Sequence, residues 1–238
     1  MSDLEDMCYL SNTSRDFLEG QKRELRELPY VEVVGITRGP ESVECFYDDV
    51  LAAPYIVELA EKAERDKFDA VVISCFFDPG LKAAREAISI PVTSAGESSL
   101  HLACSLGERI GIVTTVPNSI PVIRHQLRGL GLESHLATVR AVSLGVLELD
   151  GSANTIDALF RESMSAIRED KADTIVLGCT GMAEAAAALQ SKIRAANIDA
   201  PVVDPLRAAI QLAEALVKLK LRHSRISYPR PPSKTRIT

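Results

Sequence analysis

The sequence predicts an α/β protein with two pseudo-symmetric lobes, each a mostly parallel sheet flanked by helices, and a cleft between the lobes. Two observations carry this prediction. Short apolar runs typical of buried strands alternate with helical periodicity along most of the chain, the pattern of parallel sheets covered by helices. In addition, one strand-and-helix unit occurs twice, at about residues 70–107 and 173–220.

Run length and spacing justify each element in chain order. The first half contains, in order, a strand at 7–10, a charged helix to about 28, a strand at 31–37, a helix at 52–67 and a strand that ends before Cys75. The second half contains a strand at 109–115, a helix, a strand at 139–144, a helix at about 155–169 and a strand that ends before Cys179.

The repeated unit is defined by its cysteines, which lie 104 residues apart in the sequence. The first copy reads Asp-Ala-Val-Val-Ile-Ser-Cys over 69–75, and the second reads Asp-Thr-Ile-Val-Leu-Gly-Cys over 173–179. Downstream, Pro91-Val92 and Pro201-Val202 each open a short strand, and a helix is expected six residues after each proline. The duplication predicts two facing half-sites with one thiol on each side of a bound molecule.

Cysteine chemistry indicates what such a pair can do. A free thiol titrates at about 8.5, and its pKa falls at a helix N-terminus or beside a cation. Both Cys75 and Cys179 precede predicted helix starts, so each is expected to act as thiolate base or thiol acid near neutral pH. Two facing thiols suit an enzyme that removes a proton from one face of a carbon and returns one to the other.

No cofactor or metal is expected. Proton transfer between two thiols requires neither a metal ion, nor pyridoxal, nor nicotinamide. The cysteines and histidines form no cluster with zinc-ligand spacing, and the glycines form neither a dinucleotide fingerprint nor a P-loop. Cys8, Cys45 and Cys104 are expected to be structural.

Composition narrows the partners to a small-molecule substrate. The net charge of −6 argues against nucleic acid and anionic membranes as partners, and no apolar stretch reaches the roughly 20 residues that span a bilayer. Residues 1–6 are acidic and lack a signal-peptide pattern. Five cysteines, an odd number, fit reduced thiols, so a cytoplasmic location is expected.

The repeat also predicts the domain organisation. One lobe is expected to comprise residues 1–96 and 206–222, and the other residues 97–205. Residues 223–238 are basic and proline-rich without apolar periodicity, so we expect a flexible tail or a segment docked on a neighbouring subunit.

Three segments resemble the hydantoin/allantoin racemase family of the aspartate/glutamate racemase superfamily. They are Cys-Phe-Phe-Asp-Pro-Gly-Leu at 75–81, Gly-Ile-Val-Thr-Thr at 111–115 and Leu-Gly-Cys-Thr-Gly-Met at 177–182. The resemblance covers nearly all of residues 7–220. It implies a cofactor-independent racemase of 5-substituted hydantoins, allantoin included, with the active site between the lobes, and it favours a homo-oligomer.

The resemblance also implies roles for particular residues. Cys75 and Cys179 become the catalytic pair, with Cys75 acting on the D-isomer and Cys179 on the L-isomer. The substrate is expected to contact residues beside the cysteines and at strand ends, namely Asn12, Phe76, Thr114, Thr115, Thr180 and Gly181. Two departures bear on the substrate: residues 10–13 read Leu-Ser-Asn-Thr where the family has Asn-Pro-Asn-Thr, and Phe77 replaces a smaller or polar residue.

Two alternatives stay open from the sequence. One is another two-cysteine enzyme of the superfamily, acting on aspartate or glutamate or isomerising maleate. The other is a ligand-binding protein that kept the fold and lost turnover, which predicts binding without solvent-proton exchange at the stereocentre.

Overall fold

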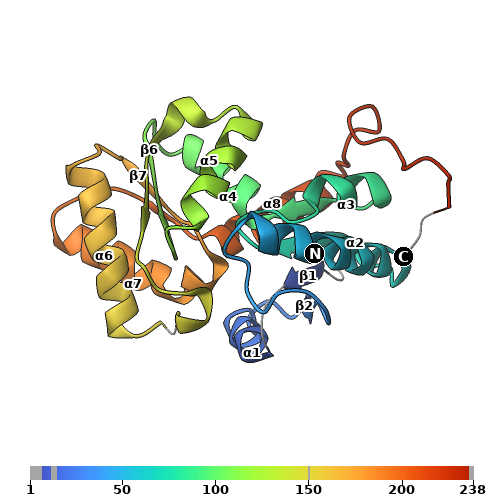
Figure 1. Ribbon diagram of the computed structural model, residues 1–238, viewed down its shortest axis with the longest axis horizontal. Coiled ribbons are helices and arrows are strands. Elements are labelled where there is room, and N and C mark those ends of the chain that lie inside the picture. Colours follow the sequence, from blue (N-terminus) through green and yellow to red (C-terminus); the bar gives the residue numbers. More distant parts are fainter. Residues whose placement is uncertain (1–6, 12–14, 150, 236–238) are drawn as a thin grey trace.

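The computed structural model describes residues 7–11, 15–149 and 151–235 of the 238-residue chain. Strands and helices alternate as predicted, in two four-stranded sheets flanked by helices (Figure 1). The first sheet and its helices are β1 (Met7–Ser11), α1 (Arg15–Glu24), β2 (Val31–Gly35), α2 (Phe46–Arg65), β3 (Ala70–Ser74), α3 (Leu81–Ala87) and β4 (Val92–Ser94). The remaining elements are α4 (Ala95–Cys104), β5 (Ile110–Thr114), α5 (Ser119–Leu130), η1 (Glu133–His135), β6 (Leu136–Ala141), η2 (Val146–Glu148), α6 (Ala153–Arg168), β7 (Thr174–Leu177), η3 (Thr180–Met182), α7 (Ala183–Ala195), β8 (Val202–Val203) and α8 (Pro205–Lys218).

The two sheets have the same topology, with every paired strand parallel. The strand order is β2-β1-β3-β4 in the first sheet and β6-β5-β7-β8 in the second. Equivalent hydrogen bonds join the last two strands of each: Val71 N–H donates to Pro91 O, and Ile175 N–H donates to Pro201 O, both at 2.9 Å. The duplication read from the sequence is therefore a duplication of backbone structure.

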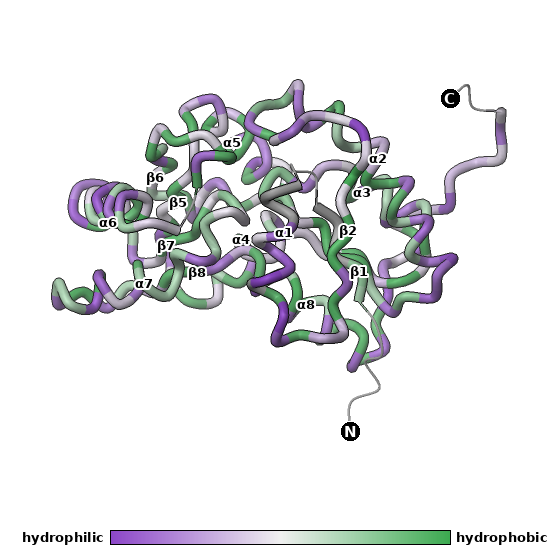
Figure 2. The backbone as a smooth tube through the Cα atoms, turned by 90° about the horizontal axis from the view of Figure 1, so that it is seen from below, coloured by the Kyte–Doolittle hydropathy of each residue, from purple (hydrophilic) through white to green (hydrophobic). Residues whose placement is uncertain are grey.

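Burial explains why the central strands are continuous apolar runs. All five residues of β3, all five of β5 and all four of β7 are buried, as expected where helices cover both faces of a parallel sheet. Figure 2 shows the two sheets side by side, with α6 and α7 at one end of the molecule and α2 and α3 at the other.

Helices α4 and α8 each follow one sheet in the sequence but pack against the other. They lie at the centre of the molecule and pack against each other (Figure 1). Helix α4 follows the first sheet, but its Leu100 packs with Ile110 and Ile112 of the second. Helix α8 follows the second sheet, but its Ile210 packs with Val72 of the first. We propose that the lobes divide as the sequence predicts, with α8 in the lobe of residues 1–96 and α4 in the lobe of 97–205.

Some helix boundaries differ from the predicted ones. Helix α2 begins at Phe46 rather than at 52, because Asp48 accepts the N–H of Glu44 at 3.1 Å and two acidic residues occupy the first turn. Helices α4 and α8 begin four residues after Pro91 and Pro201, not six. Among the described residues, no helix combines the length and apolarity needed to cross a membrane.

The stretch after α8, for which we predicted a flexible or subunit-docked tail, contacts its own chain in this structure. We call residues 222–230 the C-terminal segment. It lies along α3 of its own chain, where side chains of Arg225 and Arg230 donate to backbone carbonyls at the end of that helix (Figure 1). Basic side chains can satisfy the last carbonyls of a helix, so a basic tail finds partners there.

Candidate active site

A small pocket lies where the carboxyl ends of the two sheets meet. This is the edge where ligands of open α/β sheets bind. Its lining residues come from both sheets and the loops beside them: Val43, Ser74, Cys75, Phe76, Phe77, Thr115, Ser119, Val146, Gly178, Cys179 and Thr180. The two cysteines predicted to face one ligand therefore share one pocket.

Cys75 follows β3 directly and is buried. Its carbonyl accepts the N–H of Asp78 at 3.2 Å, and the next carbonyl, that of Phe76, accepts Gln126 Nε2–H at 2.8 Å. Asp78 adopts a left-handed conformation with φ 59°, so the chain reverses here before α3 begins at Leu81. We call residues 75–78 the Cys75 turn.

The Asp78 carboxylate joins the Cys75 turn to the start of α4. It accepts the N–H groups of Gly96 and Glu97, both at 2.9 Å, together with Gln126 Nε2–H at 2.5 Å and the hydroxyl of Ser94. Burial raises the pKa of Asp78 to about 7, and the charge of Glu97 adds to the shift while the hydrogen bonds oppose it. A buried carboxylate thus lies three residues from the first thiol.

Cys179 follows β7 after one glycine, at the position equivalent to Cys75. A Cβ added to Gly178 would lie 2.8 Å from the Cβ of Thr114, so only glycine lets β7 pass β5 this closely. The Cys179 Sγ accepts the N–H of Gly181 at 3.4 Å, in the first turn of η3, which leads into α7.

The pKa of the second thiol, that of Cys179, is strongly raised. Burial raises the pKa of Cys179 to about 12; the N–H of Gly181 opposes the shift and the charge of Glu44 adds to it. The lowered thiol pKa expected from a helix N-terminus is therefore wrong for Cys179, because loss of hydration outweighs one N–H contact. Without a ligand, Cys179 is a neutral thiol that can donate a proton.

Most of the predicted site residues come together. Cys75, Phe76, Thr115, Cys179 and Thr180 all line the pocket. Thr114 lies behind it, fully buried, with its hydroxyl donating to Gly178 O at 3.4 Å. Gly181 contributes its N–H to Cys179 rather than a lining surface. Asn12 lies outside the described residues.

Six lining residues are absent from the predicted set: Val43, Ser74, Phe77, Ser119, Val146 and Gly178. Ser74 occupies the position before Cys75 that Gly178 occupies before Cys179, so the repeat itself contained a signal for it. Its hydroxyl donates to Thr180 Oγ1 at 3.3 Å, which joins the two half-sites. Ser119 is the first residue of α5, Val146 is the first residue of η2, and Val43 lies in the connection between β2 and α2. No local pattern marks these three, because only tertiary folding brings them to the sheet ends.

The described residues that line the pocket include no acidic or basic side chain. Among the described lining residues none carries a positive charge, and four offer hydroxyl groups: Ser74, Thr115, Ser119 and Thr180. Elsewhere in the described residues, no three His, Cys, Asp or Glu side chains form a group that could hold a metal ion. This chemistry fits a neutral, hydrogen-bonding molecule held between two sulfur atoms.

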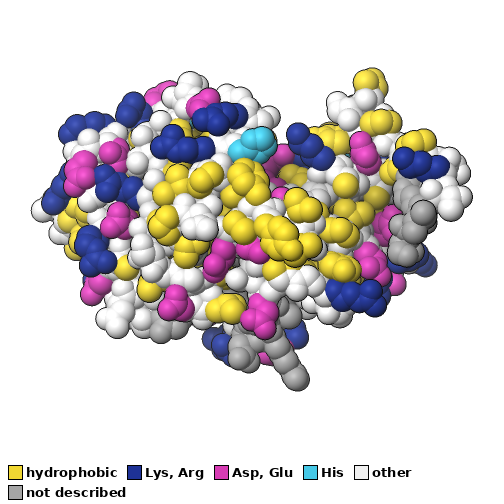
Figure 3. Space-filling view, viewed as in Figure 1, with side chains coloured by type: hydrophobic (Ala, Val, Ile, Leu, Met, Phe, Trp, Pro, Cys, Tyr) yellow, Lys and Arg dark blue, Asp and Glu magenta, His cyan; other side chains and the backbone are white. Residues whose placement is uncertain are grey.

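Large apolar side chains are exposed on the two elements next to the lining residues Val43 and Val146 in the chain. Phe46, Tyr47, Val50 and Leu51 at the start of α2 are exposed, as is Leu147, which follows the lining residue Val146. Figure 3 draws one face of the molecule, with hydrophobic side chains gathered across its middle, below a notch between the two lobes.

The family profile described as Asp/Glu/Hydantoin racemase matches residues 10–213. The chain is 35% identical over 197 residues to a hydantoin racemase of Pseudomonas sp. (strain NS671), which covers 82% of this chain and 77% of that protein. The solved allantoin racemase of Klebsiella pneumoniae superposes with a TM-score of 0.89 at 32% identity, over 98% of this chain and 96% of that one. The solved allantoin racemase of Pseudomonas fluorescens superposes with a TM-score of 0.89 at 33% identity, over 98% of this chain and 100% of that one. The chain therefore belongs to the Asp/Glu/Hydantoin racemase family and is an isomerase.

Proposed function

We propose that this enzyme racemises 5-substituted hydantoins by proton transfer between Cys75 and Cys179. The observation that carries the proposal is that two thiols on equivalent strands of the two sheets line one pocket. The related proteins named above are a hydantoin racemase and two allantoin racemases, and allantoin is itself a hydantoin.

The reaction balances with the two thiols alone. One cysteine, as thiolate, takes the proton from C5, so that a C–H bond breaks and an S–H bond forms. The electron pair moves onto the neighbouring carbonyl oxygen and leaves a planar enolate. The second cysteine then gives its proton to the opposite face of C5 and becomes a thiolate. The neutral state of Cys179 suits it to the donor role when Cys75 is the base.

The lining favours a hydantoin ring over an amino acid. A free amino acid or a dicarboxylate carries a negative charge that needs cationic or multiple N–H donors, and the described lining residues include no cation. A hydantoin ring is neutral when its N–H groups are protonated, and its carbonyl and N–H groups match the hydroxyls of Thr115, Ser119 and Thr180.

The apolar residues of the lining favour an apolar group on C5. Val43, Phe77 and Val146 line the pocket, and further apolar side chains are exposed on α2 and η2. We therefore expect 5-benzyl- and 5-isobutylhydantoin to be used with a higher kcat/KM than allantoin, whose ureido group is polar. Loss of each polar contact that such a group would need costs about 1–3 kcal/mol.

Proton NMR in D₂O tests the proposal directly. L- and D-enantiomers of each hydantoin are incubated with the protein, and the C5–H signal and the optical rotation are followed, with correction for spontaneous exchange. Enzyme-dependent loss of both signals supports racemisation and ranks the substituents. Exchange on none of them, with turnover of aspartate, glutamate or maleate, would overturn the proposal. Tight binding without exchange would identify a binding protein instead.

A further inference from the structure

The C-terminal segment covers the open edge of the first sheet. Strand β4 is the last strand of that sheet, and its Val92 N–H donates to His223 Nε2 at 2.8 Å. The rings of His223 and Tyr228 meet edge to face at 5.8 Å between centroids. The His223 side chain, from beyond α8, thus satisfies an N–H on an edge that the sheet leaves without a further strand, and the Tyr228 ring packs against it.

The same segment closes the end of α3. Arg225 donates to the carbonyls of Arg85 and Glu86, at 3.0 and 3.1 Å, and to that of Ile88. Arg230 donates to Ala87 O at 2.6 Å. The last carbonyls of a helix have no partner within the helix, so these arginines replace water as donors. The profile match to the family ends at residue 213, before this segment begins.

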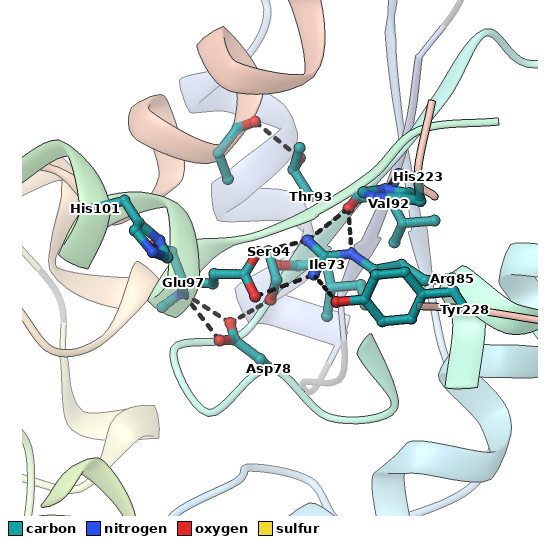
Figure 4. A network of polar contacts seen from close by, with 12 residues as sticks. Ile73, Asp78, Arg85, Val92, Thr93, Ser94, Glu97, His101, His223 and Tyr228 are labelled. Atoms are coloured by element: carbon teal, nitrogen blue, oxygen red, sulfur yellow. Dashed lines mark hydrogen bonds and ion pairs between the residues drawn. The ribbon is translucent and has the colours of Figure 1, made fainter. Parts of the chain in front are cut away.

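Arg85 connects the segment to the interior. Its guanidinium is buried and forms a two-pronged ion pair with Glu97, with contacts of 2.5 and 3.1 Å. It also donates twice to Val92 O, and its Nη1 donates to the Tyr228 hydroxyl at 3.3 Å (Figure 4). The Tyr228 ring lies 5.5 Å from the guanidinium carbon, within range of a cation–π contact.

Glu97 is connected to the Cys75 turn through Asp78. It lies in the first turn of α4, where its own N–H donates to Asp78 Oδ2 at 2.9 Å. Asp78 in turn belongs to the Cys75 turn and donates its N–H to Cys75 O. Figure 4 shows Tyr228, Arg85, Glu97 and Asp78 as one continuous series of contacts from the segment to this turn.

We infer that the C-terminal segment positions Cys75: His223 and Tyr228 fix Arg85, Arg85 fixes Glu97 and the start of α4, and α4 fixes the Cys75 turn through Asp78. These are positioning residues, since none of them lines the pocket. The inference rests on the proposed function for its catalytic consequence, but its structural part does not. The corresponding series is specific to the first half-site, because the second cysteine is held by Gly181 and α7.

The test compares two full-length variants with the parent enzyme. His223→Ala combined with Tyr228→Ala removes the contacts to Val92 and Arg85, and Ile226→Ala is the matched control, because that side chain is 96% exposed in the same segment. Alkylation of each cysteine by iodoacetamide is followed by mass spectrometry, with circular dichroism to confirm folding. In the double variant we expect Cys75 to react about three- to tenfold faster, with the rate at Cys179 unchanged.

Turnover provides the second readout. Misplacement of one thiol should lower kcat about tenfold while KM stays within about twofold, as expected for a group that acts on the reacting atom rather than on binding. Tyr228→Phe, which removes only the hydroxyl, should shift both readouts in the same direction by a smaller factor, and it covers the case in which the double variant does not fold.

Two results would overturn the inference. One is a double variant that matches Ile226→Ala in both readouts, and the other is an equal rise in alkylation at Cys75 and Cys179, which indicates general loosening. If the parent enzyme racemises no hydantoin, the proposed function fails, whereas the alkylation comparison still decides whether the segment orders the Cys75 turn.

Discussion

The two half-sites share their strands but not the turns that hold their cysteines. Cys75 and Cys179 follow equivalent strands, β3 and β7, in sheets of the same order. The Cys75 turn is fixed by distant elements: N–H groups of α4 donate to its Asp78 carboxylate, and Gln126 of α5 donates to its Phe76 carbonyl. Cys179 is fixed locally, by the N–H of Gly181 and the start of α7. The repeat thus conserves where the thiols lie, while each environment is built from different neighbours.

This difference lets one fold give two thiols separate properties. A reaction that takes a proton on one face and returns it on the other needs one thiol and one thiolate in each direction. Burial holds Cys179 as a neutral thiol, and a titratable carboxylate with a pKa of about 7 lies in the turn of Cys75. Because the two cysteines have different neighbours, their thiols can differ in protonation. Two identical turns would give both thiols the same environment.

The largest expected effect comes from removing either thiol. Cys75→Ser and Cys179→Ser should each lower racemisation by about 10²- to 10⁴-fold, the contribution of a positioned acid or base, with the fold intact. Polarimetry with each enantiomer measures the loss. Each variant should retain C5 proton exchange for the single enantiomer that its remaining thiol deprotonates.

Cys104→Ser is the matched control for the thiol variants, because Cys104 lies in α4 and packs with the apolar core of the second sheet. It should keep full activity. Loss of activity in this control, with Cys75 and Cys179 dispensable, would contradict the paired-thiol site.

The residues before the two cysteines should differ in their tolerance of substitution. Gly178→Ala places a Cβ 2.8 Å from Thr114 Cβ and 3.1 Å from its Cα, so the free energy of unfolding should fall by about 1–3 kcal/mol. Ser74→Ala removes a hydroxyl that bonds Thr180 and should cost about 1 kcal/mol. Urea denaturation measures both, and equal stability of the two variants would argue against the tighter strand approach in the second repeat.

Asp78→Asn tests the carboxylate that sets the first half-site apart. The folded-state pKa of about 7 lies above the ordinary value, 3.8, so the folded state holds the proton more tightly than the unfolded state. This contribution to stability is complete below pH 3.8 and is lost as the pH rises through about 7. The stability advantage of the parent protein over Asp78→Asn should therefore shrink between pH 4 and 8.

Melting temperatures of the two proteins across this pH range provide the measurement. At pH 4 the variant should be the less stable protein, because its amide –NH₂ must face one of the donors that now point at the Asp78 carboxyl group, at a cost of about 1–3 kcal/mol. A difference in melting temperature that does not change with pH would show that Asp78 does not titrate in this range.

The smallest effect concerns the C-terminal segment. Burial lowers the pKa of His223 to about 4, and the charge of Arg85 adds to this, with Arg225 acting in the same sense and Glu97 opposing. Because Nε2 accepts the N–H of Val92, protonation would also cost that hydrogen bond. Docking of the segment is thus at full strength above pH 6.5 and weakens as the pH falls toward 4.

Hydrogen exchange of residues 222–230 at pH 5 and pH 7, corrected for the intrinsic rates, measures this change. Protection should be lower at pH 5. In His223→Gln, whose amide oxygen can accept the same N–H without titrating, protection should be independent of pH. Equal protection of the parent protein at both values would contradict a role for His223 in docking.

The sequence by itself determined the repeated strands, their parallel pairing and the position of both thiols. Apolar runs such as 70–74 and 174–177 are local signals, because a strand covered by helices on both faces must be apolar throughout. A residue that directly follows such a strand lies at the carboxyl edge of the sheet. Cys75, Phe76, Thr115, Cys179 and Thr180 could therefore be assigned to the pocket without coordinates.

Tertiary structure decided everything that depends on contacts between distant segments. Val43 reaches the pocket from a connecting segment and Val146 from η2. Asp78 meets α4 and α5, and Arg225 reaches α3 from 140 residues away in the sequence. The raised pKa of Cys179 has the same origin, since burial depends on what surrounds a side chain and not on the residues next to it. Local periodicity fixes which residues form strands and helices, but hydration and long-range hydrogen bonds are set only when those elements pack.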